Sequence, residues 1–339
     1  MIRSALAMLR RHLFTLSIVV SVAAAFVWPD FFTQWGDFKL IGLIAPLLMV
    51  IMFGMGTTLS IGDFARVAKM PVPVATGVAL QFLLMPALGF CIGKGLGLEP
   101  DLAIGCIVIG SVAGGSASNV IAYIAKANVA LSVTMTCVST FLSPFATPFL
   151  VKLYAGATVE VDALAMALEI MKITILPTVL GLVVHRVLRR PFERNRAAVE
   201  RILSLVSMTG ICVILAVIMG PAHEKAREMG LVLIAAAATH NTCGLLAGYW
   251  ATRLMMRFFP DRITERDCRT IAIEVGMQNG GMATQLAAKF FSPVAALVPN
   301  VFDIWMDVSG SVLANFWSRR ATAEPDGDRE QAIENNGGK

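Results

Sequence analysis

Two short stretches of this chain, AGGSASN at residues 113–119 and EVGMQNGG at residues 274–281, interrupt long apolar segments. Each contains a pair of glycines beside amide or hydroxyl side chains, and the second also contains the carboxylate of Glu274. Unwound backbone and ionisable side chains are tolerated at membrane depth only where they line a polar cavity. The two stretches therefore predict two broken helices whose free ends form a polar site inside a membrane.

The composition supports an all-α polytopic membrane protein. The chain has 339 residues, of which 56% are hydrophobic and 15% charged, and its mean hydropathy is +0.71. These values exclude an ordinary soluble domain. Apolar runs of about 20 residues, the length of one helical crossing, predict ten transmembrane helices, at residues 13–28, 40–60, 72–93, 101–125, 129–151, 163–187, 202–220, 229–252, 270–289 and 293–317. The first run is expected to stay in the protein, because no Ala-x-Ala-like cleavage site follows it.

Basic residues predict the orientation of these crossings in a plasma (inner) membrane. If both termini are cytoplasmic, most arginines lie in cytoplasmic segments, and the external segments hold only Lys39, Lys94, Lys152, Lys225, Arg227 and Lys289. This distribution follows the positive-inside rule. The basic residues of several short loops also account for the isoelectric point near 9.0, so this value does not indicate a nucleic-acid-binding face. Residues 1–12 are predicted to form a cytoplasmic N-terminus, and residues 321–339 a polar, disordered cytoplasmic tail.

The two halves of the chain resemble each other. The sequence VIMFG at residues 50–54 matches AVIMG at residues 216–220, at about the spacing that separates the two glycine-rich stretches. Residues 13–153 and 154–320 are therefore predicted to be two five-helix repeats. Because five crossings is an odd number, the second repeat must be inverted. Inverted repeats with one broken helix each are typical of transporters that bind substrate and ions near the membrane midplane, so helices 4 and 9 should cross there.

The polar residues near the breaks predict a sodium site. Hard monovalent cations prefer several oxygen ligands and few formal charges. Candidate oxygens come from Ser118 and Asn119 after the first break, and from Glu274, Gln278 and the carbonyls of Val275 and Met277 around the second. Further candidates are Gln81 and the stripe Ser132, Thr136, Ser139 and Ser143. Simpler interpretations are also open. The hydroxyl groups could bond the backbone of their own helix, the glycines could only allow close helix packing, and Glu274 could lie at a helix end within reach of interfacial water.

Several ordered motifs resemble the bile acid:sodium symporter family. They are GSASNV at residues 115–120, NVALSV at 128–133, Ser-Pro at 143–144, Thr-Pro at 147–148 and EVGMQN at 274–279. The resemblance covers roughly residues 10–320. It implies ten helices, with helices 1, 2, 6 and 7 in a panel domain and helices 3–5 and 8–10 in a core domain where discontinuous helices 4 and 9 cross.

The resemblance also implies two sodium sites that share Glu274. Carried over by motif, the first site consists of Ser118, Asn119, Ser132, Thr136 and Glu274, and the second of Gln81, Glu274, Val275, Met277 and Gln278. The substrate is expected between core and panel, near Ser116 and Asn279.

One position departs from the family pattern. Before Ser309-Gly310 the family usually has His-Asn, whereas this chain has Met306-Asp307, with a second acid at Asp303. An ionised Asp307 beside an anion would repel it. Asp307 is therefore protonated or paired, or the substrate is not an ordinary organic anion. Asp307 and His240 are further candidate substrate residues, and His240 and Lys172 are possible partners for the Asp307 carboxyl group. The simpler alternative is that His240 is a buried, hydrogen-bonded histidine with a packing role only.

The sequence thus predicts a secondary transporter, not an enzyme: a symporter of sodium and an organic anion, either bile acid-like or a small carboxylate such as pantoate or a keto acid, working by alternating access. Its expected partners are the substrate, sodium and the lipid bilayer, with no nucleic acid and no obligate protein partner. One alternative is proton coupling through Glu274 or Asp307. A remote alternative is an intramembrane enzyme using Asp303, Asp307 and His240, for which no nucleophile or metal motif is present.

Overall fold

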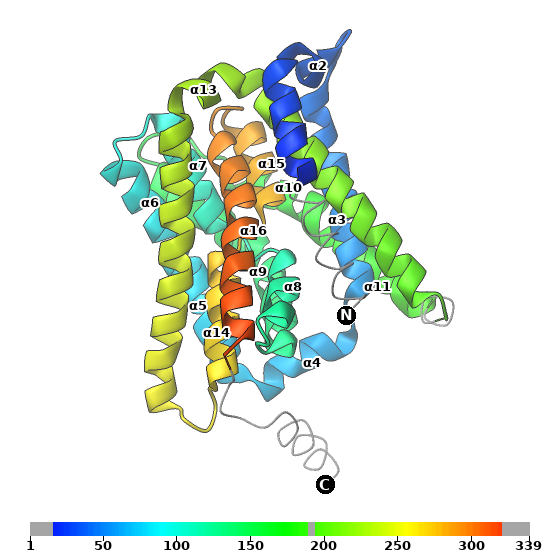
Figure 1. Ribbon diagram of the computed structural model, residues 1–339, viewed down its shortest axis with the longest axis vertical. Coiled ribbons are helices and arrows are strands. Elements are labelled where there is room, and N and C mark those ends of the chain that lie inside the picture. The colour runs from blue at the N-terminus through cyan, green and yellow to red at the C-terminus, as the bar shows by residue number, and fades with distance from the viewer. Residues whose placement is uncertain (1–15, 189–193, 321–339) are drawn as a thin grey trace.

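The computed structural model describes residues 16–188 and 194–320. The predicted N-terminal segment 1–12 and the tail 321–339 lie outside the described residues. The described chain is almost entirely helical (Figure 1). After a first apolar helix at Leu16–Val27 come α2 (Pro29–Thr33), β1 (Gln34–Trp35), β2 (Phe38–Lys39), η1 (Leu40–Leu43), α3 (Ile44–Thr58), α4 (Ile61–Lys69), α5 (Pro71–Ala79), η2 (Leu80–Leu84), α6 (Met85–Gly95), α7 (Pro100–Ser111), α8 (Ala117–Ile124) and α9 (Val129–Ala155). The second half holds α10 (Ala163–Ile170), η3 (Met171–Ile175), α11 (Leu176–Val187), α13 (Arg196–Phe258), α14 (Glu265–Gly276), α15 (Gly280–Phe290) and α16 (Leu297–Ser318).

Five helical stretches of the described chain are long and apolar enough to cross a membrane. They are Leu40–Thr58, Pro71–Gly95, Val129–Ala155, Ala163–Val187 and Arg201–Phe258. Leu16–Val27 and Pro100–Ser111 are shorter apolar helices. The length and apolarity of these helices fit a multi-pass membrane protein. The small hairpin of β1 and β2, which turns at Gly36 with a φ of 57°, is the one departure from helix that the all-α expectation did not include.

The predicted crossings at residues 202–220 and 229–252 belong to one continuous helix. α13 runs for 63 residues from Arg196 to Phe258 with Pro221 inside it, and Figure 1 shows it rising along one side, bending over the top and descending on the other. At about 1.5 Å per residue it is far too long for a single crossing. The connecting sequence PAHEKARE at residues 221–228 consists mostly of strong helix formers, so the chain bends at the proline without unwinding.

Two arms of α13 pack on different groups of helices. The rising arm lies against α3, where Gly210 faces Ile51, and α3 in turn packs closely on α11. A Cβ atom at Gly56 would overlap the carbonyl oxygen of Thr178, so these two backbones touch. The descending arm packs on α14, where Gly248 faces Ala272. α16 contacts both arms: on the rising arm, its Asn300 amide nitrogen donates to the Leu215 carbonyl oxygen at 3.1 Å. Around α9 and α14 gather α5, α6, α7, α8 and α16, and the candidate site lies among them.

Two wide helical turns, η2 and η3, were not expected. Each π-helical segment is followed within two residues by a proline, Pro86 in α6 and Pro177 in α11. Proline lacks the N–H that continues the helical ladder, and a widened turn absorbs the mismatch. Such turns recur at functional sites. η2 carries Gln81 into the interior, where only 2% of this residue is exposed.

Candidate functional site: the crossing of two broken helices

The predicted breaks are present, and they lie side by side. The chain leaves the helix between Ser111 and Ala117 and again between Gly276 and Gly280. Gly114 and Gln278 pair as an isolated antiparallel bridge. The Gly115 amide donates to the Met277 carbonyl oxygen at 3.0 Å, and the Asn279 amide donates to the Ala113 carbonyl oxygen at 2.9 Å. Backbone N–H and C=O groups that lose their helical partners at one break therefore find hydrogen-bond partners on the other break.

This pairing requires glycine at residue 115. A Cβ atom there would overlap the backbone carbonyl oxygen of Gln278, and at Gly114 it would lie 3.1 Å from the Glu274 carboxylate oxygen Oε2. The two unwound segments are thus in backbone contact, with no side chain between them. Close backbone approach is the physical use of glycine here.

Glu274 is the centre of an oxygen-rich cluster. The residue is 2% exposed. The hydroxyls of Ser118 in α8 and Ser132 in α9 both donate to its Oε1 atom, and the Thr136 hydroxyl donates to Oε2 at 3.0 Å. The Ser139 hydroxyl oxygen accepts from the Gly114 amide at 3.3 Å. Three members of the predicted hydroxyl stripe of α9 therefore face the crossing, whereas the Ser143 hydroxyl donates to the Thr140 carbonyl oxygen of its own helix at 2.7 Å. One carboxylate lies among neutral oxygens, the ligand set that a monovalent hard cation prefers.

Asn119 adds an unused oxygen near this cluster. It lies in the first turn of α8, one residue after Ser118. Its side-chain oxygen Oδ1 is buried and has no hydrogen-bond partner among the residues that the structure describes. A buried polar atom without a partner is costly, which makes this oxygen a candidate ion ligand.

Three members of the predicted second group of ligands, Gln81, Val275 and Gln278, are hydrogen-bonded to one another at the crossing. The Gln81 amide nitrogen donates to the Val112 carbonyl oxygen at 2.8 Å and also to the Gln278 side-chain oxygen. The Gln278 amide nitrogen donates to the Val275 carbonyl oxygen at 2.7 Å. Both glutamines and Val275 thus share one buried network, whereas the Met277 carbonyl oxygen accepts from the Gly115 amide on the opposing segment.

The candidate substrate residues Ser116 and Asn279 precede the two second half-helices, and only the Asn279 side chain makes a capping hydrogen bond. Ser116 is half-buried and immediately precedes α8. The Asn279 side-chain oxygen accepts from the Met282 amide at 3.0 Å at the start of α15, and its amide nitrogen lies 3.9 Å from the Met52 sulfur in α3. Asn279 therefore contacts both groups of helices that the two arms of α13 cover.

His240 and Asp307 occupy different surroundings. His240 is 1% exposed, its Nε2 atom lies 2.9 Å from the Met85 carbonyl oxygen, and its ring packs edge-on against Phe302. These contacts are those of a packed, hydrogen-bonded histidine, and a substrate role for it stays a prediction. Asp307 is half-buried on α16, one turn after Asp303, whose carboxylate packs against Gly280 at the start of α15.

Sequence reasoning missed Asn241 in α13. Its amide nitrogen donates to the Gly276 carbonyl oxygen at 2.8 Å, one of the carbonyls freed where α14 ends, and its own oxygen accepts from the Ser309 hydroxyl at 2.7 Å. An amide in an apolar helix was the available signal, the same one that pointed to Gln81. Asn241 connects α13 and α16 to the second break.

Comparison with known proteins identifies the family. The model of the sodium bile acid symporter family matches residues 45–226. A sodium-dependent transporter of Bacillus subtilis, YocS, itself described as uncharacterized, is 34% identical over 320 residues that cover 94% of this chain and 95% of the relative. The chain belongs to the sodium bile acid symporter family.

Plant relatives extend this assignment. A probable sodium/metabolite cotransporter, BASS2, of the rice chloroplast is 36% identical over 82% of this chain and 64% of the relative. A chloroplastic BASS1 of Arabidopsis thaliana, with the same description, is 32% identical over 81% of this chain and 66% of its own length. As a sodium bile acid symporter family member, the chain is a sodium-dependent membrane transporter and not an enzyme, and the co-transported ion is sodium.

Proposed function

We propose that this protein couples the inward movement of two sodium ions to the uptake of an organic anion by alternating access. The main support is the junction of the two breaks, where the Glu274 carboxylate accepts hydrogen bonds from hydroxyl groups of α8 and α9. A buried carboxylate among neutral oxygens favours an alkali cation over an organic cation or a divalent ion, because its one negative charge and its small neutral ligands match one small positive charge.

Two ions follow from the two groups of oxygens. The first ion is assigned to Ser118, Asn119, Ser132, Thr136 and Glu274, and the second to Gln81, Glu274, Val275, Met277 and Gln278. In the first group the hydroxyls of Ser118, Ser132 and Thr136 bond Glu274, and in the second Gln81, Gln278 and Val275 are hydrogen-bonded to one another, with Gln278 in the bridge to Gly114 that joins the two breaks. Because the helices that carry these ligands end or begin at the two unwound segments, sodium binding would order the crossing and so favour substrate binding next to it.

We further propose ten crossings arranged as two inverted repeats, residues 13–153 and 154–320, with a panel domain moving against a core domain. Supporting this division, α3 packs closely on α11 and on the rising arm of α13, where Gly210 faces Ile51, while α14 packs on α5, α8 and α9 and on the descending arm, where Gly248 faces Ala272. In this proposal the bent α13 supplies two crossings, and each of the pairs α5–α6, α7–α8, α10–α11 and α14–α15 supplies one. With Leu16–Val27, α3, α9 and α16, and without the short helices α2 and α4, this makes ten crossings.

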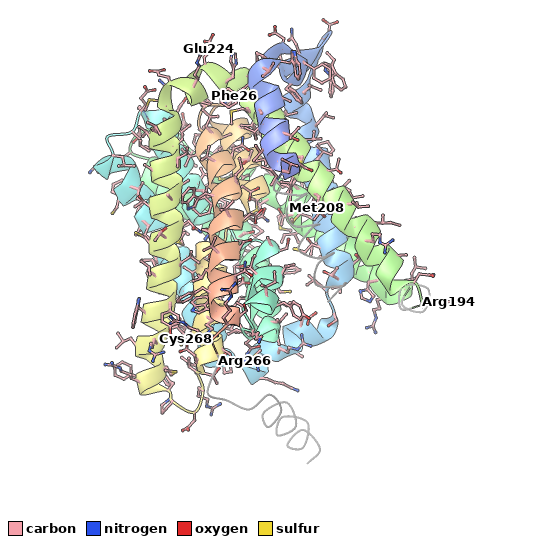
Figure 2. All side chains as sticks on the ribbon, viewed as in Figure 1. Phe26, Arg194, Met208, Glu224, Arg266 and Cys268 are labelled. Atoms are coloured by element: carbon pink, nitrogen blue, oxygen red, sulfur yellow. The ribbon has the colours of Figure 1, made fainter. Side chains whose placement is uncertain are left out.

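The proposed orientation places the protein in the plasma (inner) membrane with both termini in the cytoplasm. Figure 2 shows Arg194 and Arg266 near one end of the molecule and Glu224 at the opposite end. Clusters of arginine mark the cytoplasmic side of a membrane protein. The end that carries Arg266 and the start of α14 is therefore assigned to the cytoplasm, and the end of α15 to the external side.

The substrate is assigned to the space beside Ser116 and Asn279, where the second half-helices begin. The positive end of the helix dipole at these positions favours a carboxylate. The plant relatives are described as sodium/metabolite cotransporters, which favours a small metabolite acid, such as pantoate or a keto acid, over a bile acid.

Uptake into proteoliposomes tests the proposal. A sodium gradient at fixed pH should drive accumulation of a labelled carboxylate, and replacing sodium by potassium should abolish it. Accumulation that ignores sodium and follows an acid-outside pH gradient would replace sodium coupling by proton coupling through Glu274 or Asp307. A screen of small carboxylates and steroid acids by thermal shift, in sodium and again in potassium, would select the substrate for this experiment.

Replacing the acid on α16 tests the substrate charge. Asp307→Asn removes a negative charge near the proposed anion position, and charge repulsion across a partly wet cavity amounts to a few kcal/mol. We expect the Kd for a carboxylate substrate, measured by thermal shift in saturating sodium, to fall by about tenfold, equivalent to about 1.4 kcal/mol. Weaker or unchanged binding would mean that Asp307 does not face the anion as a charged group.

A further inference from the structure

A row of contacts joins α15 to α10 and η3 on the external side of the crossing. On α15, Met282, Gln285 and Lys289 recur at intervals of three and four residues and so share one face. The Thr174 hydroxyl lies 3.4 Å from the Met282 sulfur, and two turns further along α15 the Lys289 ammonium lies 2.6 Å from the Glu169 carboxylate. The two elements run in opposite directions and are fastened at both ends of this row.

Glu169 is the most constrained member of the row. Its side chain is only 6% exposed, and both of its carboxylate oxygens are used: Oε2 by Lys289 and Oε1 by the Gln285 amide at 3.3 Å. Lys289 is 47% exposed. A buried carboxylate that loses its ion-pair partner becomes an uncompensated charge, which is strongly unfavourable. This contact therefore favours the conformation in which α15 lies against α10.

The two second half-helices differ in what they contact. α15 packs chiefly on α16 and α7 and also touches α3 and α10, and Gly281 in its first turn faces Leu48 of α3. By contrast α8, the corresponding half-helix after the first break, packs on α9, α14 and α16. Figure 1 shows α10 and α15 in the half of the molecule opposite α4, and the two helices are in contact. Of the two half-helices, α15 is therefore the one whose close contacts, within the described chain, extend to α3 and α10.

We propose that Glu169, Gln285 and Lys289 form an external latch. The latch holds α15 against α10 in the conformation seen here and opens when the site is reached from the external side. It rests on the proposed function, because a latch of this kind has a role only where one group of helices moves against the other. It also assigns a function to Glu169, a buried acid that contacts neither of the proposed ion sites.

Labelling of a cysteine behind the latch tests the proposal. Thr174 is fully buried at the inner end of the row, and Thr174→Cys places a thiol there in a background whose six native cysteines are replaced by alanine or serine. In right-side-out vesicles, a membrane-impermeant maleimide should label this thiol slowly. Adding Glu169→Gln or Lys289→Met should raise the labelling rate by about tenfold, the effect of shifting an equilibrium by about 1.4 kcal/mol.

Two further variants separate the latch from general disruption. The reversed pair Glu169→Lys with Lys289→Glu restores attraction and should return labelling toward the parent rate. Glu99→Gln removes another ion pair of 2.6 Å, between Glu99 and Lys225, outside α10 and α15, and should leave labelling unchanged. The latch would be overturned if neither Glu169→Gln nor Lys289→Met changed the labelling rate. It would also be overturned if the reversed pair were labelled as fast as the two single variants.

Measuring how much sodium raises the melting temperature of each variant distinguishes failure of the latch proposal from failure of the proposed function. A parent protein stabilised by sodium, with labelling that ignores Glu169 and Lys289, would refute the latch alone. A parent protein that sodium does not stabilise, with labelling that still responds to both residues, would support the moving latch and refute the ion sites.

Discussion

Glu274→Gln should abolish sodium-driven uptake. The substitution keeps the size of the side chain and removes the one formal negative charge that both proposed ion sites share. Loss of groups that merely orient metal ligands lowers affinity by about 10- to 100-fold, so loss of the charged ligand itself should lower sodium affinity by at least about 100-fold. At a sodium concentration of 100 times Kd the parent gains about 2.7 kcal/mol of stability from the ion, and this gain should disappear.

Thermal unfolding in potassium separates site loss from misfolding. Without sodium, the variant should be at least as stable as the parent, because a neutral amide is less costly to bury than a carboxylate. Glu228→Gln, an exposed carboxylate on α13, is a matched control and should keep full sodium stabilisation. Sodium stabilisation of the usual size in Glu274→Gln would show that the ions bind elsewhere.

Gly115→Ala should separate the two breaks and impair both folding and transport. The added Cβ atom would overlap the Gln278 carbonyl oxygen, and backbone atoms cannot move aside as a flexible side chain does. Overpacking of this kind costs about 1–3 kcal/mol. We expect a lower melting temperature and, because the same segments position Ser118 and Glu274, a large loss of sodium affinity.

A second glycine provides the control for Gly115. Gly95 at the end of α6 has open space where its Cβ would be, so Gly95→Ala should change stability by no more than about 0.5 kcal/mol and leave sodium binding intact. If Gly115→Ala binds sodium as tightly as the parent, then the bridge between the two breaks does not position the ion ligands.

Much of this site could be predicted because polar residues within apolar helices are conspicuous. Gln81, Glu274 and the serine and threonine stripe of α9 stood out for that reason, and the structure brings them together at the crossing. The helix interruptions were equally visible, because glycine pairs beside amides are incompatible with lipid-facing helix. The continuous α13 was not predicted, since hydropathy separates two crossings whether or not the polar link between them is helical.

The sequence by itself determined the class of protein, the position of both breaks and the kinds of ligand available, because hydropathy, helix breaking and ligand chemistry are local properties. Only the tertiary structure decided which distant groups meet: Asn241 with the Gly276 carbonyl, Gly114 with Gln278, and Glu169 with Lys289. Those meetings depend on how whole helices pack, to within a fraction of an ångström. Packing is a property of all the helix faces together, so no single segment of the sequence encodes it.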